Sequence, residues 1–233
     1  MRLDKYLADS GVGTRKEIKS LVRSGAVTVD GAPVRDPSFH VPDAAAVCIN
    51  GKKIGYKKYI CIMMNKPDGY VSATYDKRLP VVTDLLDSYS LSFEPFPAGR
   101  LDIDTEGMLI LTNDGALCHR ILSPKKHIRK KYLAQTDLPI TDDDVAAFER
   151  GVTLDDGYVC MAALLERADG ANQSFVTLCE GKFHQVKRMF EARGKTVTYL
   201  KRVRMGNLPL DENLKTGEYR ELTDEEIDKL EEK

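Results

Sequence analysis

The pattern of apolar and polar positions predicts a small helix-then-strand module at the start of the chain. Thr14 and Glu17 have the spacing of a capping box, and apolar residues on one helical face follow them. Gly25 stands where a helix stop is expected. The alternating segment 27–34 contains an Asp-Gly turn and predicts a hairpin.

From residue 59 onward the pattern alternates between apolar strands and short helical segments. Strands are predicted at 59–64, 108–112, 131–136 and 174–178, and helices at 141–151, 184–193 and 223–230. We therefore expect a domain at 1–45, a linker at 46–58 and a larger domain at 59–233. The fold class is α+β: a small α/β module precedes a larger domain with a mostly antiparallel mixed sheet.

Composition narrows the classes of protein that the chain can belong to. No apolar run approaches the roughly 20 residues that a membrane span needs, and the first residues lack the apolar stretch of a secretory signal. The five cysteines are scattered without a CxxC pair. That spacing argues against a disulfide framework and a zinc site, and we expect a cytoplasmic protein.

The net charge of −1 hides a segregation of charge along the chain. Residues 182–204 hold eight bases and one acid, whereas residues 211–233 hold ten acids and four bases. Residues 125–131 are basic at five of seven positions. Clustered bases without matching acids indicate a polyanionic partner, because binding to nucleic acid releases condensed counterions.

An acidic loop in segment 99–115 is the strongest candidate for chemistry. Asp102, Asp104 and Glu106 stand just before an apolar strand, which places them at a strand edge. Such residues can equally satisfy local backbone donors. Spacing alone does not choose among the three carboxylates.

Four ordered segments resemble the motifs of pseudouridine synthases of the RsuA/RluA superfamily. They are Asn65-Lys66-Pro67, Gly99-Arg100-Leu101-Asp102 with Thr105 and Gly107, Lys131-Tyr132, and the segment from Glu180 to Phe190. Residues 1–45 resemble an S4 RNA-binding domain. The Lys187-Arg188-Met189-Phe190 form and the short chain are similar to the RsuA branch, which modifies small-subunit ribosomal RNA.

This resemblance implies an enzyme that isomerises a uridine of 16S ribosomal RNA to pseudouridine. Asp102 would be the nucleophile and Lys187 the basic residue paired with it. Tyr132 would stack on the uracil, and Arg100 would fill the space left by the uridine as it leaves its helix. The isomerisation needs no cofactor, and we expect no metal.

The resemblance also implies residues that hold ribosomal RNA, which we expect to be the partner of a monomeric protein. In the first domain, Arg15, Lys19 and Arg23 recur every four residues and share one helical stripe. In the larger domain we expect phosphate contacts from Lys66, Lys130, Lys131, Lys182 and Arg188.

Three other functions fit parts of the same pattern. A synthase of the same family could act on large-subunit (23S) ribosomal RNA. An S4-type protein could bind RNA without reacting. A metal-dependent nuclease could hold magnesium with Asp102, Asp104 and Glu106; a requirement for divalent metal would distinguish it.

Overall fold

A computed structural model describes residues 1–42, 44–123 and 126–232. Lys125, which belongs to the basic run at 125–131, lies outside the described residues. The chain divides into two compact units. One comprises residues 1–60 and 87–94, and the other comprises residues 61–86 and 95–233.

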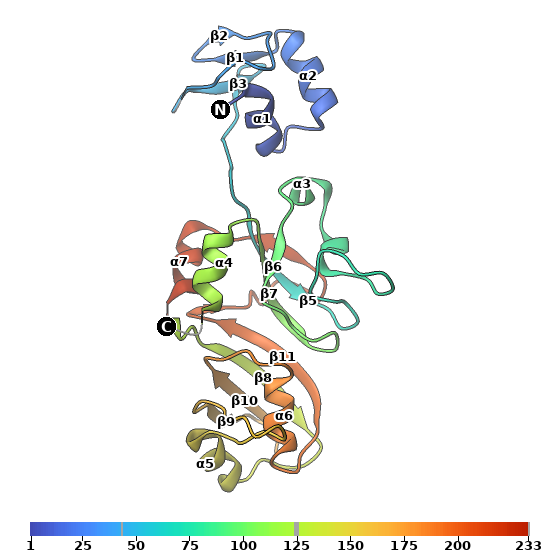
Figure 1. The fold of residues 1–233 in the computed structure, drawn as a ribbon, viewed down its shortest axis with the longest axis vertical. Helices are drawn as coiled ribbons and strands as arrows, with labels where there is room; N and C mark the ends of the chain where they lie inside the picture. The colour runs from blue at the N-terminus through green and yellow to red at the C-terminus, as the bar shows by residue number, and fades with distance from the viewer. Residues whose placement is uncertain (43, 124–125, 233) are drawn as a thin grey trace. The chain divides into compact units, whose positions relative to one another are not determined.

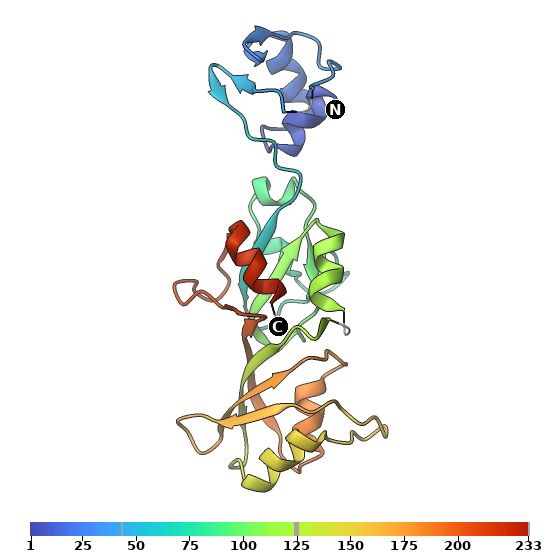
Figure 2. The ribbon, with the colours of Figure 1, turned by 90° about the vertical axis from the view of Figure 1, so that its left-hand side faces the viewer.

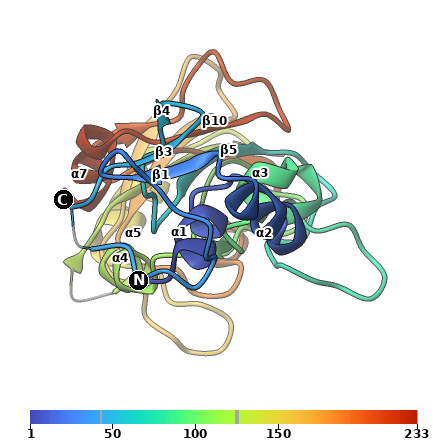
Figure 3. The same cartoon turned by 90° about the horizontal axis from the view of Figure 1, so that it is seen from above.

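The N-terminal unit is built from short helices and short strands. Its elements are α1 (Leu3–Asp9), α2 (Arg15–Arg23), β1 (Val27–Val29), β2 (Ala32–Pro33), β3 (Val47–Ile49), β4 (Lys52–Lys53) and α3 (Ser88–Leu91). The capping box at Thr14 and Glu17 is present, and β1 pairs with β2 across the predicted turn. Apolar residues of α1, α2, β1 and β3 form one core. The two helices lie beside the small sheet (Figure 1 and Figure 3).

The segment that we predicted as a linker contains part of this sheet. Strand β3 pairs antiparallel with β1, and β4 pairs with β3, so the order is β2-β1-β3-β4. The Asn50-Gly51 pair, which falls within the predicted linker, is the turn between β3 and β4, with positive φ at both residues. The boundary between the units falls after Ile60.

The larger unit contains one extended mixed sheet. Its strands are β5 (Cys61–Lys66), β6 (Phe96–Ala98), β7 (Glu106–Thr112), β8 (Lys130–Thr136), β9 (Leu164–Arg167), β10 (Gln173–Leu178), β11 (Val197–Met205), β12 (Leu208–Pro209) and β13 (Tyr219–Glu221). The order along the sheet is β13-β5-β7-β11-β8-β10-β9, with β6 beside β7 and β12 beside β11. The pair β7–β11 is parallel and the other pairs are antiparallel, which confirms the predicted α+β class.

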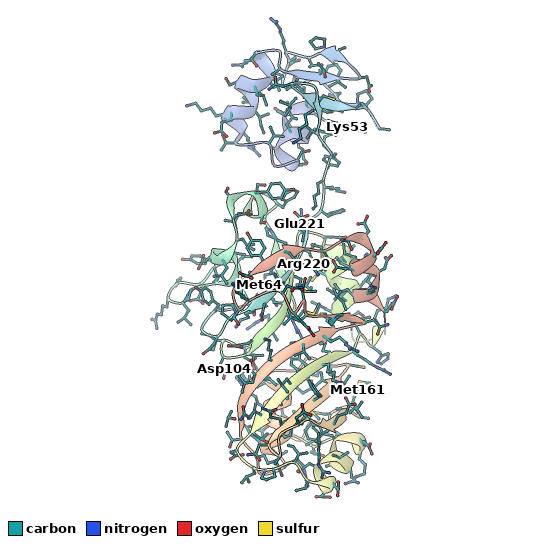
Figure 4. The ribbon with its side chains drawn as sticks, turned by 180° about the vertical axis from the view of Figure 1, so that it is seen from behind. Lys53, Met64, Asp104, Met161, Arg220 and Glu221 are labelled. Carbon is teal, nitrogen blue, oxygen red and sulfur yellow. The ribbon has the colours of Figure 1, made fainter. Side chains whose placement is uncertain are left out.

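Two helices cover the part of the sheet around β5 and β7 (Figure 1 and Figure 2). They are α4 (Gly115–Leu122) and α7 (Asp224–Glu231), and between β5 and β6 lies the 3-10 turn η1 (Val82–Leu85). Asp114 caps α4 by accepting from two backbone N–H groups. The acidic C-terminal helix buries Leu230 against the sheet, and Arg220, labelled in Figure 4, binds Glu226 of the helix.

The other part of the sheet carries α5 (Asp142–Arg150) and α6 (Gln185–Glu191). Strand β8 alternates, so that Lys130, Tyr132 and Ala134 are buried while Lys131 belongs to the opposite face. Tyr132 stands opposite Val176 of β10 and opposite Arg202 of β11. The sequence pattern missed β11 because charged residues break its apolar positions.

Gly107 allows β7 and β11 to approach closely beside the acidic loop. It has a φ of +97°, and a β-carbon there would lie 2.3 Å from the carbonyl oxygen of Arg202. No side chain fits at that distance. The parallel pairing of Gly107 with Arg202 therefore depends on glycine.

The buried side chains of Lys66 and Ser72 form hydrogen bonds with the backbone of the loop between β6 and β7. The Lys66 ammonium donates to the carbonyl oxygens of Pro67, Ile103 and Thr105 at 2.9, 3.0 and 2.9 Å. The hydroxyl of Ser72 accepts from the N–H of Leu101 and donates to its carbonyl oxygen. The loop backbone is therefore fixed on both sides of Asp102.

Lys66 does not have the exposure expected of a phosphate contact. The residue is 0% exposed, and its N–H groups are directed to backbone oxygens. Burial lowers the pKa of Lys66 to about 8, against the attraction of nearby carboxylates that include Asp68 and Asp104. A lysine at the end of a buried strand thus serves as a structural anchor.

This burial predicts a pH-dependent stability. Between pH 8 and the ordinary lysine value of 10.5, the unfolded chain holds a proton at Lys66 that the folded chain has released. Stability rises with pH wherever the unfolded state binds more protons. The free energy of unfolding of the wild type should therefore rise relative to that of Lys66→Met, by on the order of 2–3 kcal/mol across this window. Urea unfolding at a series of pH values measures it.

Lys182→Met is the matched control, because Lys182 is exposed. The free energy of unfolding of Lys182→Met should differ from that of the wild type by the same amount at every pH between 8 and 10.5. Parallel pH curves for the wild type and Lys66→Met would contradict the buried anchor.

Candidate active site

Two carboxylates of the loop between β6 and β7 meet one lysine of α6. The Nζ atom of Lys187 lies 3.5 Å from Oδ2 of Asp102 and 2.5 Å from Oδ1 of Asp104. Burial acts to raise the pKa of Asp104, but the Lys187 ammonium outweighs it and holds that pKa below its usual range. The structure thus brings together Asp102 and Lys187, which stand 85 positions apart in the chain.

A buried carboxylate positions the segment that leads into α6. Glu180 accepts hydrogen bonds from the Tyr158 hydroxyl at 2.5 Å, the N–H of Met161 at 2.8 Å and the Gln185 amide at 2.7 Å. Burial alone would raise the pKa of Glu180, but these donors hold it below its ordinary value. The first turn of α6 is therefore tied to the strand end that precedes it.

Two aromatic residues, Phe183 and His184, directly precede α6. His184 adopts a left-handed conformation with a φ of 48°, and its Nε2 atom lies 3.5 Å from Oδ1 of Asp102. Phe183 stacks on the His184 ring at a centroid distance of 3.8 Å and is 72% exposed. An exposed, stacked aromatic pair beside a carboxylate offers a surface on which a nucleobase can stack.

A cavity joins two of the three predicted catalytic residues, Asp102 and Tyr132, whereas Lys187 is not among the residues that line it. Asp102, Tyr132 and Arg100 all line it, together with His184 and the first residues of α6. Tyr132 presents its ring from the buried face of β8, whereas Arg100 is exposed at the start of the loop. Asp104, labelled in Figure 4, lies further along the same loop, before β7.

The predicted RNA-contact residues of the larger unit differ in their surroundings. Lys182 is exposed, with its Nζ atom 4.7 Å from the centre of the Tyr158 ring. Lys131 pairs with Glu166 at 2.9 Å and belongs to the sheet face opposite Tyr132. Arg188 pairs with Asp155 and Asp156, and these contacts raise its pKa above the ordinary arginine value.

Lys130 does not have the exposure expected of a surface phosphate contact. It is 6% exposed, and its Nζ atom donates to the carbonyl oxygen of Ile128 at 3.3 Å. It is therefore reached from inside a cavity and not from the open surface.

The basic stripe of the N-terminal unit forms as predicted. Arg15, Lys19 and Arg23 are exposed on α2, while Ile18 and Val22 are buried on its other face. Arg15 and Lys19 border a hollow together with the bases Arg2 and Lys5 and the acids Asp4 and Asp9. This surface has the charge that suits a polyanion.

The acidic loop does not assemble the ligand set of a metal-dependent nuclease. Glu106 accepts a hydrogen bond from the Tyr199 hydroxyl at 2.8 Å, while Asp102 and Asp104 face Lys187. Burial and the Glu106 carboxylate raise the pKa of Tyr199 to about 12. In the part of the chain that the structure describes, no three acidic, histidine or cysteine side chains could hold a metal ion together.

Sequence reasoning gave no particular role to three residues around the site. Ser72 and Glu180 position the two segments that carry the reactive groups, and Arg202 stands beside Tyr132. Glu180 lies within a recognised motif, so its place there was a usable signal. Nothing in the sequence distinguishes Arg202 from the other basic residues of segment 182–204.

Comparison with known proteins agrees with this geometry. The model of the RNA pseudouridylate synthase family matches residues 60–192, and that of the S4 domain matches residues 1–44. Among the described residues, no helix is long and apolar enough to cross a membrane.

Similar proteins match over almost their whole length. An uncharacterized RNA pseudouridine synthase of Bacillus subtilis is 50% identical, covering 100% of this chain and 99% of its own. Ribosomal small subunit pseudouridine synthase A of Escherichia coli K12 is 40% identical, with coverage of 97% and 98%. The counterpart of Vibrio parahaemolyticus is also 40% identical, with coverage of 99% of each chain.

A solved structure has the same arrangement of elements. The crystal structure of a pseudouridylate synthase superposes with a TM-score of 0.70 at 36% sequence identity, and 99% of each chain is covered. With the family model matching more than half of the residues and the S4 model matching the N-terminus, the chain belongs to the RNA pseudouridylate synthase family.

Proposed function

We propose that this protein isomerises one uridine of small-subunit ribosomal RNA to pseudouridine, with Asp102 as the nucleophile. The observation that carries the proposal is the cavity in which the Asp102 carboxylate, close to Lys187, shares a wall with Tyr132. The proposed enzyme works as a monomer in the cytoplasm and needs no cofactor.

The reaction exchanges one bond for another within a single nucleotide. The bond between N1 of uracil and C1′ of the ribose breaks, the base turns, and C5 bonds to C1′. The proton on C5 leaves, and N1 gains one, so no atom is added and no redox change occurs. A carboxylate at C1′ can attack the sugar directly or assist a glycal route, and both routes use Asp102.

Lys187 supports the charge of the nucleophile in this proposal. The Lys187 ammonium lies 3.5 Å from the Asp102 carboxylate and places a positive charge beside the group that attacks or removes a proton. Its closer contact with Asp104 fixes the ammonium between two carboxylates. Asp104 is then a positioning residue for Lys187.

Arg100 and Tyr132 are proposed to act on the target nucleotide as it leaves the RNA helix and while it reacts. An enzyme that acts on a base must first extract it from the stack. Exposed Arg100 at the mouth of the cavity can occupy the space that the uridine leaves, and the Tyr132 ring inside can stack on the uracil. Stacking on an aromatic ring contributes about 1–3 kcal/mol for each base.

The choice of small-subunit RNA rests on the relatives that carry that activity in their names. These are about 40% identical to this chain over nearly its full length. The N-terminal S4 domain supplies the exposed stripe of Arg15, Lys19 and Arg23 for structured RNA.

Mapping pseudouridine in unmodified ribosomal RNA tests the proposal. The protein is incubated with small- and large-subunit RNA in EDTA without cofactor, and carbodiimide-blocked primer extension locates the product. A single new stop in small-subunit RNA is expected. A stop in large-subunit RNA would overturn the target but keep the chemistry. No stop with free RNA or with partly assembled particles would leave an RNA-binding protein without activity.

Asp102→Asn should abolish the reaction and preserve RNA binding. The substitution keeps the size of the side chain but removes the nucleophilic charge, so the single-turnover rate should fall by about a thousand-fold or more. Filter binding should give an affinity close to that of the wild type. Substantial activity in this variant would remove Asp102 from the mechanism.

Two substitutions of Lys187 should distinguish the effect of its charge on the reaction from the effect of its size. Lys187→Met should lower the single-turnover rate by about 100-fold, since it removes one charged donor beside the reacting carboxylate. Lys187→Arg, which keeps the charge, should retain most of the activity. In Lys187→Met the pKa of Asp104, followed by NMR, should rise, because the cation that lowers it is gone. An unchanged Asp104 pKa would contradict the pairing.

Neutralising the stripe on α2 should weaken RNA binding without slowing the chemical step. The triple variant Arg15→Gln, Lys19→Gln, Arg23→Gln should bind ribosomal RNA less tightly. Its affinity should also depend less on salt, because the slope of log affinity against log salt falls by about 0.7–0.9 for each phosphate that the protein no longer neutralises. The rate at saturating RNA should stay the same.

A charge-matched control uses Lys16, Lys52 and Lys53, which are exposed in the same unit but off the stripe. Their triple substitution by Gln should affect binding less. Equal effects of both triple variants would show that only total charge matters.

A further inference from the structure

A second cavity adjoins the one that contains Asp102. Its volume is about 530 Å³, and Arg100, Tyr132 and Lys182 line both cavities. Met161, labelled in Figure 4, borders the second cavity as well. Two further cations, Arg202 and Lys130, line the second cavity only.

These two cations are buried, and among the described residues neither has a carboxylate partner. Arg202 is 2% exposed, and its Nε atom donates to the carbonyl oxygen of Met108 at 2.7 Å. Its Nη2 atom is buried and has no hydrogen-bond partner in the part of the chain that the structure describes. Lys130 makes a long contact of 3.3 Å to the Ile128 carbonyl oxygen. Within the described ranges, neither side chain forms an ion pair with an acid.

The one carboxylate that lines the cavity, among the described residues, is already engaged. Glu180 accepts from Tyr158, Met161 and Gln185, which satisfies its oxygens and directs it to the start of α6. Glu180 therefore does not neutralise Arg202 or Lys130 through a direct contact.

Two close cations without a counter-charge destabilise each other. Burial and the neighbouring Arg202 lower the pKa of Lys130 to about 8. Arginine does not release its proton in proteins, so its charge remains inside the fold. A buried charge without a partner is strongly unfavourable, and an anion in the cavity would remove that cost.

We propose that this second cavity binds one phosphodiester of the RNA chain, with Arg202 and Lys130 as its ligands, next to the uridine that enters the catalytic cavity. The inference rests on the proposed function, since it names a contact of the same substrate. Arg202 stands opposite Tyr132 on the neighbouring strand, so the phosphate site and the base site share one sheet face.

The chemistry of the site favours a phosphate over a base edge. A carbonyl group of uracil offers a partial charge, whereas two cations call for a full anion. The phosphodiesters are the anionic groups of an RNA chain. Arginine also matches phosphate geometry, because its planar guanidinium can donate two parallel hydrogen bonds.

Neutral phosphate analogues test the contact directly. Oligoribonucleotides that contain the target uridine are made with a methylphosphonate on its 5′ or its 3′ side. Single-turnover rates and dissociation constants are measured for the wild type, Arg202→Gln and Lys130→Gln. Each variant should lower the rate over dissociation constant by about 10–100-fold on normal RNA, as expected for a charge-assisted hydrogen bond.

The decisive result is whether the effect of the protein substitution depends on the methylphosphonate in the RNA. At one of the two positions, the methylphosphonate should reduce wild-type activity to a similar extent and cause almost no further decrease in Arg202→Gln or Lys130→Gln. Effects that add in full, or a wild type indifferent to both methylphosphonates, would overturn the proposal.

Arg204→Gln is the matched control for charge. Arg204 is exposed on the same strand and lines a different hollow, with Lys131. Any decrease in activity that it causes should add in full to that of the methylphosphonate. Circular dichroism melts establish whether each variant folds; if Arg202→Gln does not, Lys130→Gln and the wild type on the two analogues still decide the question.

A measurement of phosphate binding that does not depend on catalysis distinguishes failure of this inference from failure of the proposed function. Inorganic phosphate, compared with chloride at equal ionic strength, should raise the unfolding midpoint of the wild type more than that of Arg202→Gln or Lys130→Gln. Equal shifts would count against the phosphate site. Absence of pseudouridine in any RNA, together with a phosphate shift that depends on Arg202, would overturn the proposed function alone.

Discussion

The position of Asp102 depends on one buried ammonium group. Lys66 ends strand β5, and its N–H groups donate to the carbonyl oxygens of Pro67, of Ile103 within the Asp102–Asp104 segment and of Thr105 just after it. Ser72 binds the N–H and the carbonyl oxygen of Leu101 from the other side. A loop fixed through its backbone leaves its carboxylate side chains free to face Lys187 and the cavity.

Different parts of the fold deliver the other groups to this loop. Glu180 ties the first turn of α6 to the end of β10, which brings Lys187 within 3.5 Å of Asp102. Strand β8 directs Tyr132 to the same side through its alternation. Gly107 lets β7 and β11 pair closely, so the loop stands beside the strand that carries Arg202.

The charges around the site are unevenly compensated. Lys187 is matched by two carboxylates and Arg188 by Asp155 and Asp156, whereas Arg202 and Lys130 form no ion pair with an acid among the residues that the structure describes. The paired cations already have a counter-charge in the free protein, whereas unpaired buried cations destabilise it until an anion arrives. Such a division is suited to a site in which part of the binding surface is completed by the substrate.

The sequence by itself determined the fold class, the capped helix α2 and the family, because these depend on local periodicity and on motifs that are contiguous in the chain. It could not determine which bases are exposed. Lys66, Lys130 and Lys182 have the same side chain, yet the first two are buried and the third is exposed. Nor could spacing choose among Asp102, Asp104 and Glu106. Only the tertiary structure directed two of these acids to Lys187 and the third to Tyr199, since such contacts join residues more than 80 positions apart.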